Sequence, residues 1–178
     1  AVVGAGHCPG ITRILTNDEP VDLEQISVLP SSVGLGTLLM WTIPMVILGS
    51  FAYLYSQDAA LASASSKVWI LANGVPTSIG ALIALSHPLV IILAFVAAPI
   101  TSLIPWIGAG VVTGLLQIYL VPPRVKELES LSEEIGVTKM WWKNRVLKVF
   151  LAFILPSLGS AIGTFIGAAE LFNALFDT

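Results

Sequence analysis

Long runs of apolar residues separated by short polar stretches dominate the chain from residue 33 onward. The first run, 33–55, has 23 residues and no charge, which is long enough to cross a bilayer with some tilt. Pro44 lies inside it, and bilayer helices tolerate such a proline. Residues 56–67 are more polar and are expected to form a short connection.

The next apolar residues, 68–121, are too long for one helix and contain several helix breakers. Residues 68–86 predict one helix, and His87 with Pro88 then interrupts the chain. The following 33 uncharged residues, 89–121, would measure about 50 Å as a single helix. Since a hydrocarbon core is about 30 Å thick, two shorter helices, 89–104 and 106–121, fit better.

The remainder predicts a polar surface segment followed by a last span. In 123–135 the apolar side chains fall on one helical stripe, so a surface helix is expected there. Residues 146–172 form the last apolar run. The fold class predicted is mainly α: a polytopic membrane domain of about five hydrophobic helices, some short or broken, covering 33–178.

Residues 1–32 have the composition of a soluble protein, unlike the apolar remainder, and are interpreted as the end of a soluble domain plus a linker. Ala1–Val3 resemble the last strand of an α/β domain, and Pro9–Leu15 could begin a short helix with Arg13 exposed. Residues 16–25 are polar and turn-rich, and Pro30 falls in the linker 27–32.

The charges suggest an orientation and exclude one class of partner. Six of the eight Lys and Arg residues lie between 124 and 148, so the positive-inside rule places the 122–145 loop in the cytoplasm. Five spans then put the N-terminal segment in the cytoplasm too, whereas four spans, or a re-entrant hairpin formed by 68–104, would put it outside. Only 11% of the residues are charged and the net charge is −3, so no nucleic-acid partner is expected.

Polar residues and glycines within the apolar runs indicate helix packing or a path for a solute. The polar positions are Asn73, Thr77, Thr101, Ser102, Thr113 and Gln117. Hydrogen bonds between helices are their ordinary role, and broken helices of transporters are the alternative. Gly159, Gly163 and Gly167 repeat every four residues, which lets backbones approach closely, either within the chain or in a homo-oligomer. Gly110 and Gly114 form a second such pair.

Three residues could carry chemistry. His7 follows Gly4-Ala5-Gly6 after the expected strand, at the kind of turn where sites are often built, and imidazole is a common metal ligand. Cys8 is the only cysteine. A zinc site shared with His7 is disfavoured because neighbours on a strand point to opposite faces, and Cys8 is expected to be a small packed side chain. His87 is expected to begin a helix near the headgroups.

Several of these blocks together resemble the TraB/PrgY (pheromone shutdown, Tiki-related) family, in its archaeal type. The resemblance covers essentially the whole chain: "VVGAGHCPGI" (2–11), "TIPMVILGSFAY" (42–53), "NGVPTSIGALIALSHPL" (73–89), "FVAAPITSLIP" (95–105), "PRVKELESL" (123–131) and "WWKNRVLKVFLAFILPSLGSAIGTFIG" (141–167). The membrane blocks are more specific than the short glycine-histidine motif.

The resemblance implies a soluble domain with two Gly-x-x-His motifs and an acidic residue, of which Gly4 and His7 match the second motif. It implies a metal-dependent peptide hydrolase or an inactivator of a peptide pheromone, with His7 as metal ligand or transition-state stabiliser and a divalent metal in the full-length protein. The first motif and the acid have no counterpart here, so we expect a C-terminal portion whose soluble domain lies upstream.

Residues 1–178 alone are accordingly expected neither to hold a catalytic metal nor to cleave peptides. Their expected role is to anchor the protein in the plasma membrane, with the bilayer as partner. A non-catalytic binding or regulatory module and a small-solute transporter stay open as alternatives.

Overall fold

The computed structural model describes residues 3–17 and 35–176, which belong to two units, 1–34 and 35–178. Within the described residues the chain is helical and contains no β-strand. The predicted α class is therefore confirmed. The predicted strand Ala1–Val3 falls mostly on residues 1–2, which lie outside the described residues, and Val3 itself is not in a strand.

In the N-terminal unit, a 3₁₀ turn, η1 (Ala5–His7), leads directly into α1 (Cys8–Asn17). The helix expected at Pro9–Leu15 is thus present, and Arg13 is exposed on it. No residue of α1 is buried. Pro9 at the second helical position is compatible with a helix start, because the first N–H groups have no partner in the helix.

The second unit begins with α3 (Leu35–Gln57) and α4 (Ala59–Ile83), which are separated by Asp58 alone. The Asp58 carboxylate accepts hydrogen bonds from the N–H groups of Ala60, at 2.7 Å, and Leu61, at 3.3 Å. This N-cap starts α4 nine residues before the expected position of 68, so the polar connection predicted over 56–67 was wrong. Serines in this part bond within the helix, as Ser66 does to the Ala62 carbonyl.

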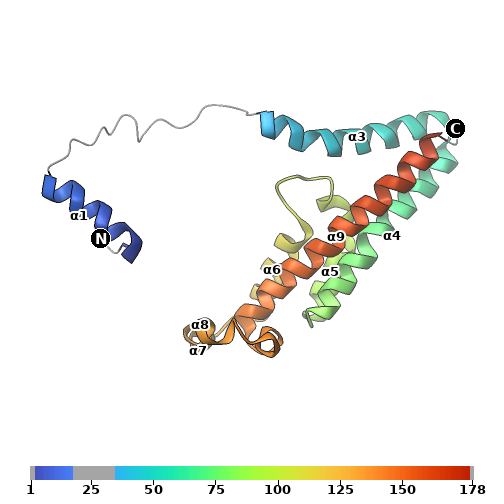
Figure 1. Ribbon diagram of the computed structural model, residues 1–178. Helices are drawn as coiled ribbons and strands as arrows, with labels where there is room; N and C mark the ends of the chain where they lie inside the picture. The colour runs from blue at the N-terminus through green and yellow to red at the C-terminus, as the bar shows by residue number, and fades with distance from the viewer. Residues whose placement is uncertain (1–2, 18–34, 177–178) are drawn as a thin grey trace. The chain divides into compact units, whose positions relative to one another are not determined.

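α4 and α9 (Arg145–Phe176) form the central antiparallel pair of the unit, seen side by side in Figure 1. Their contacts run in opposite directions along the two helices: Gly80 meets Leu155, Gly159 meets Pro76, and Gly167 meets Trp69. The end of α3 packs on this pair, where Ile47, Leu54 and Trp69 join one apolar cluster.

α5 (Pro88–Thr101) and α6 (Ala109–Leu120) form a helical hairpin beside the pair. α5 runs antiparallel to α4, since the Ser78 hydroxyl bonds to the Ile91 carbonyl and Trp69 Nε1 bonds to the Pro99 carbonyl. α6 then returns, and Gln117 reaches the backbone N–H of His87. The start of α5 and the end of α6 therefore lie at the same end of the bundle.

That end, here called the basic end, comprises the turn 84–87 and the segment 121–145. The surface helix expected over 123–135 is broken at Ser130 into α7 (Val125–Glu129) and α8 (Leu131–Glu134), and η2 (Thr138–Trp142) follows. Val125 and Ile135 on the predicted apolar stripe are exposed.

Two described helices are long and apolar enough to cross a membrane, Gly36–Gln57 and Arg145–Phe176, judged by length and composition. The helices expected at 89–104 and 106–121 are shorter than predicted, with 14 and 12 residues. The remaining expected span is α4, which has 25 residues but carries many small polar side chains.

Candidate functional site

The Gly4–His7 motif forms a helix entry in the structure instead of a strand end. The His7 N–H donates to the Gly4 carbonyl at 2.9 Å, and the next residue begins α1. His7 is exposed, and so is Cys8, which was expected to be packed. The reason is local: α1 buries no residue, so nothing in it covers a small apolar side chain.

Within residues 3–17 and 35–176, no three His, Cys, Asp or Glu side chains group so that they could hold a metal ion. A catalytic metal usually takes about three protein ligands and keeps one position open. The described residues around His7 therefore do not fit a complete metal site.

A second candidate site is the set of polar residues inside the helical bundle, here called the Asn73 cluster (Asn73, Ser102, Ser160 and Thr164). The Asn73 Oδ1 accepts hydrogen bonds from the Ser102 hydroxyl at 2.7 Å and from the Thr164 hydroxyl at 3.0 Å. Its Nδ2 donates to the Trp69 carbonyl at 3.0 Å. Ser102 and Ser160 lie 3.1 Å apart between their hydroxyl oxygens. One buried amide thus joins α4, α9 and the tip of the hairpin.

The other polar positions predicted in the apolar runs also have partners. The Thr113 hydroxyl donates to the Ala152 carbonyl at 2.6 Å, which ties α6 to α9. The Gln117 Oε1 accepts a hydrogen bond from the His87 N–H. The hydroxyls of Thr77 and Thr101 donate to backbone carbonyls of their own helices. His87 caps α5, as expected, because its Nδ1 accepts the Leu89 N–H at 3.3 Å. These contacts match a packing role more closely than a solute path.

The glycine repeat of α9 faces α4 of the same chain. A methyl group on Gly159 would overlap the Pro76 carbonyl, one on Gly163 would overlap the Ala72 carbonyl, and one on Gly167 would come within 2.8 Å of the Trp69 ring. Gly110 of α6 meets the backbone of Phe153 in the same way. The predicted close approach is therefore found within the chain. Homo-oligomer formation stays a prediction, and α4 already covers this glycine face.

Asn144 organises the basic end and was missed by sequence reasoning. Its Oδ1 accepts the Val146 N–H at 2.8 Å and so caps α9, and its Nδ2 donates to the Glu127 carbonyl and to Glu134 Oε2, each at 2.8 Å. An asparagine just before a long apolar run is an N-cap signal that could have revealed it. Trp142 Nε1 adds a bond to the Ile83 carbonyl at 2.7 Å, fastening the segment to α4.

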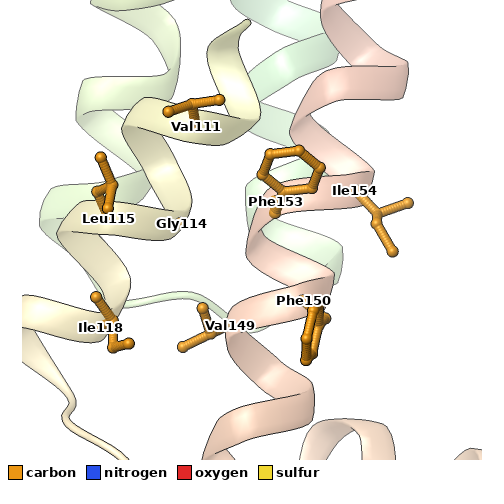
Figure 2. A pocket seen from close by; sticks show the side chains of 8 residues that line it. All are labelled: Val111, Gly114, Leu115, Ile118, Val149, Phe150, Phe153 and Ile154. Carbon is orange, nitrogen blue, oxygen red and sulfur yellow. The ribbon is translucent and has the colours of Figure 1, made fainter. Parts of the chain in front are cut away.

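An apolar groove of about 440 Å³ lies between α6 and α9. Figure 2 shows the side chains around it, with Gly114 leaving space between the two helices. Its lining residues are Val111, Gly114, Leu115, Ile118, Val149, Phe150, Phe153 and Ile154.

These features define the class of the second unit as an all-helical domain built on a glycine-packed antiparallel pair. The family model described as TraB family protein, C-terminal domain, matches residues 35–176. The chain belongs to the TraB family, as its sequence blocks predicted.

The chain is also similar to an uncharacterized archaeal protein, MJ1365 of Methanocaldococcus jannaschii. The two are 31% identical over 174 residues, which is 93% of this chain and 44% of the relative. The chain thus spans less than half the length of that relative, whose archaeal source agrees with the archaeal type expected. No solved structure matches the chain.

Proposed function

We propose that residues 35–176 form an integral membrane domain that anchors the protein's soluble part at the plasma membrane. The observation that carries the proposal is the distribution of polar and apolar side chains. Asn73, Thr77 and Thr113 are each 0% exposed, whereas Ile43 is 63% and Phe165 is 79% exposed. Large exposed apolar surfaces are rare in soluble monomers, but a bilayer favours them outside and polar contacts between helices inside.

The proposed arrangement has three crossings, α3, α4 and α9, and one re-entrant hairpin; of the three, α3 and α9 are both long and apolar enough to cross a membrane. α4 and α9 would measure about 37 and 48 Å, and α3 about 34 Å, all longer than a hydrocarbon core of about 30 Å. α5 and α6 would measure only about 21 and 18 Å. The first residue of α5 and the last residue of α6 both lie at the basic end. The hairpin tip bonds to Asn73, about 15 Å from the end of α4. Irregular backbone at such a depth is tolerated where protein covers it or where it lines a water-filled cavity. Residues 102–105 of the loop are partly buried and 106–108 are exposed, so position 106 is the one to test.

The orientation follows from the basic residues. Six of the eight Lys and Arg residues lie between 124 and 148, at the basic end, which favours the cytoplasmic side for that end. With α3, α4 and α9 crossing, the N-terminal segment is also cytoplasmic, as it would be with five spans. The two arrangements differ only in the hairpin loop 102–108, which lies within the bilayer in one and outside the cell in the other.

The test is membrane extraction followed by cysteine labelling in intact cells. The protein should stay in the membrane pellet at alkaline pH, and release into the supernatant would overturn the anchor. For labelling, Cys8→Ser supplies the background for Gln57→Cys, Trp106→Cys and Lys143→Cys. An impermeant maleimide should label position 57 in intact cells, position 143 only after lysis, and position 106 in neither. Labelling of position 106 from outside would restore five spans, and labelling of position 143 from outside would reverse the orientation.

A second proposal concerns the full-length protein and rests on the family resemblance and family membership alone. In it, a soluble domain acts on a peptide substrate as a metal-dependent hydrolase or as an inactivator of a peptide signal, and Gly4 with His7 contributes to that site. Since the described residues do not fit a complete metal site, the other ligands would have to come from outside them.

This second proposal is tested with the full-length protein and synthetic peptides, measuring cleavage products by mass spectrometry together with bound metal. Cleavage and metal that disappear in His7→Ala, but persist in the exposed helix control Thr12→Ala, support it. Peptide binding without cleavage would instead identify a non-catalytic module. Solute flux that responds to Asn73→Ala and ignores His7→Ala would identify a transporter.

A further inference from the structure

The groove between α6 and α9 has the form of a lipid site, and we infer that it holds one acyl chain of an anionic phospholipid whose headgroup lies at the basic end. The inference rests on the membrane location proposed above. It concerns a specific, retained lipid, as opposed to the exchanging lipids that surround any membrane protein.

The dimensions of the groove suit a single hydrocarbon chain. It follows α6 from Val111 to Ile118, seven residues that advance about 10 Å. Spread over that length, a volume of about 440 Å³ gives a mean cross-section of about 42 Å², or a width of about 6.5 Å. A helix with its side chains is about 10–12 Å across. A helix of a second copy would enter the groove with its side chains only, and the experiment below separates that occupant from a lipid.

The lining is apolar throughout, and the groove opens toward the outside of the bundle. Gly114 forms part of the floor because it has no side chain to fill the space beside Phe153 (Figure 2). Leu115 is 64% exposed and Phe150 is 49% exposed, so the rim faces the surroundings. An apolar concavity facing hydrocarbon can be filled by a lipid tail at no cost in unpaired polar groups.

One basic side chain, Arg145, lies where a headgroup would sit. Arg145 is one helical turn before Val149, and its Nη1 donates at 3.2 Å to the carbonyl of Pro122, about one turn beyond Ile118. Arg145 of α9 thus contacts the segment that follows α6, at the end of the groove.

The charges near this bridge include both signs. Arg145 Nε lies 3.7 Å from a Glu127 carboxylate oxygen, while Arg124 and Lys126 are exposed nearby in the sequence together with Glu129. A basic residue near an anionic membrane surface contributes about fivefold in binding, so a preference of this order for an anionic headgroup is expected.

The experiment uses the protein purified from membranes in mild detergent, with native mass spectrometry after addition of equal amounts of phosphatidylglycerol and phosphatidylcholine carrying identical acyl chains. We expect one lipid to be retained per chain, and the amount of bound phosphatidylglycerol to be about five times that of phosphatidylcholine. Leu115→Trp, which fills the groove from an exposed position, should abolish retention. The control Leu82→Trp, at a similarly exposed site on α4, should preserve it.

Arg124→Gln and Arg145→Gln, tested separately, should bring the two lipids toward equal retention without removing lipid binding. If both lipids are retained equally and Leu115→Trp does not change that retention, only surrounding lipid is bound. That result would overturn the inference. A disulfide-linked dimer formed by Leu115→Cys in the Cys8→Ser background would also overturn it, in favour of a second copy. Loss of the protein from the membrane pellet would instead refute the membrane location itself.

Discussion

Gly163 offers the sharpest test of how the α4–α9 pair is held together. A methyl group at this position would overlap the Ala72 carbonyl and lie 2.6 Å from the Asn73 Cα. Both neighbours are backbone, so no side-chain rotation can make room and the two helices must move apart. Their separation also stretches the 3.0 Å hydrogen bond between Thr164 and Asn73.

The expected magnitude follows from three terms. Overpacking costs about 1–3 kcal/mol, and a hydrogen bond between membrane helices contributes about 0.6 kcal/mol. Alanine gains back about 1 kcal/mol of helix propensity over glycine. Gly163→Ala should therefore lower the free energy of unfolding by about 0.6–2.6 kcal/mol, which corresponds to a melting temperature about 1–10 °C lower.

Thermal unfolding in detergent measures this effect, and Gly49→Ala is the matched control. Gly49 lies inside α3 with no atom within 4 Å of a built Cβ, so only the propensity gain operates there. The two substitutions should shift the melting temperature in opposite directions. If Gly163→Ala is as stable as the control, close contact at this glycine does not hold the helices together.

Three further substitutions test single contacts by the same unfolding measurement. Asn144→Ala should cost about 1–2 kcal/mol, because it removes the N-cap of α9 and two further bonds, and an unchanged stability would contradict that role. Thr113→Val should cost about 0.6 kcal/mol through loss of the bond to the Ala152 carbonyl, with the exposed α6 substitution Tyr119→Phe as a neutral control. Ser86→Ala should be neutral or stabilising by about 1 kcal/mol, since the buried Ser86 hydroxyl has no hydrogen-bond partner in the described structure; a loss of stability would reveal one.

The sequence predicted the apolar helices well, because a long run without charge leaves few alternatives. The length of 89–121 correctly indicated that it is not one helix; Pro105 lies between α5 and α6, whereas Pro99 lies inside α5. The start of α4 was missed because alanine and serine lower the hydropathy of 59–67 without preventing a helix. The Asp58 cap was the available signal.

The direction of the hairpin and the partner of the glycine face could not be predicted in this way. Both depend on contacts between residues far apart in sequence, such as the bond from Thr164 to Asn73 across 91 positions. The spacing of Gly159, Gly163 and Gly167 predicts a close approach and leaves its partner open. At His7 the motif predicted a turn, and the structure shows a helix entry with an exposed imidazole.

The pairing of α4 with α9 also has a consequence for biosynthesis. Thr164 is translated 91 residues after the Asn73 that it contacts, a delay of roughly 5–18 s at ordinary rates of synthesis. Until then Asn73 lacks one of its partners, and the close-packing face of α4 is without its glycine counterpart. The α4–α9 pair therefore cannot form until the last helix has been synthesised, so the domain is expected to become a stable unit only at the end of translation.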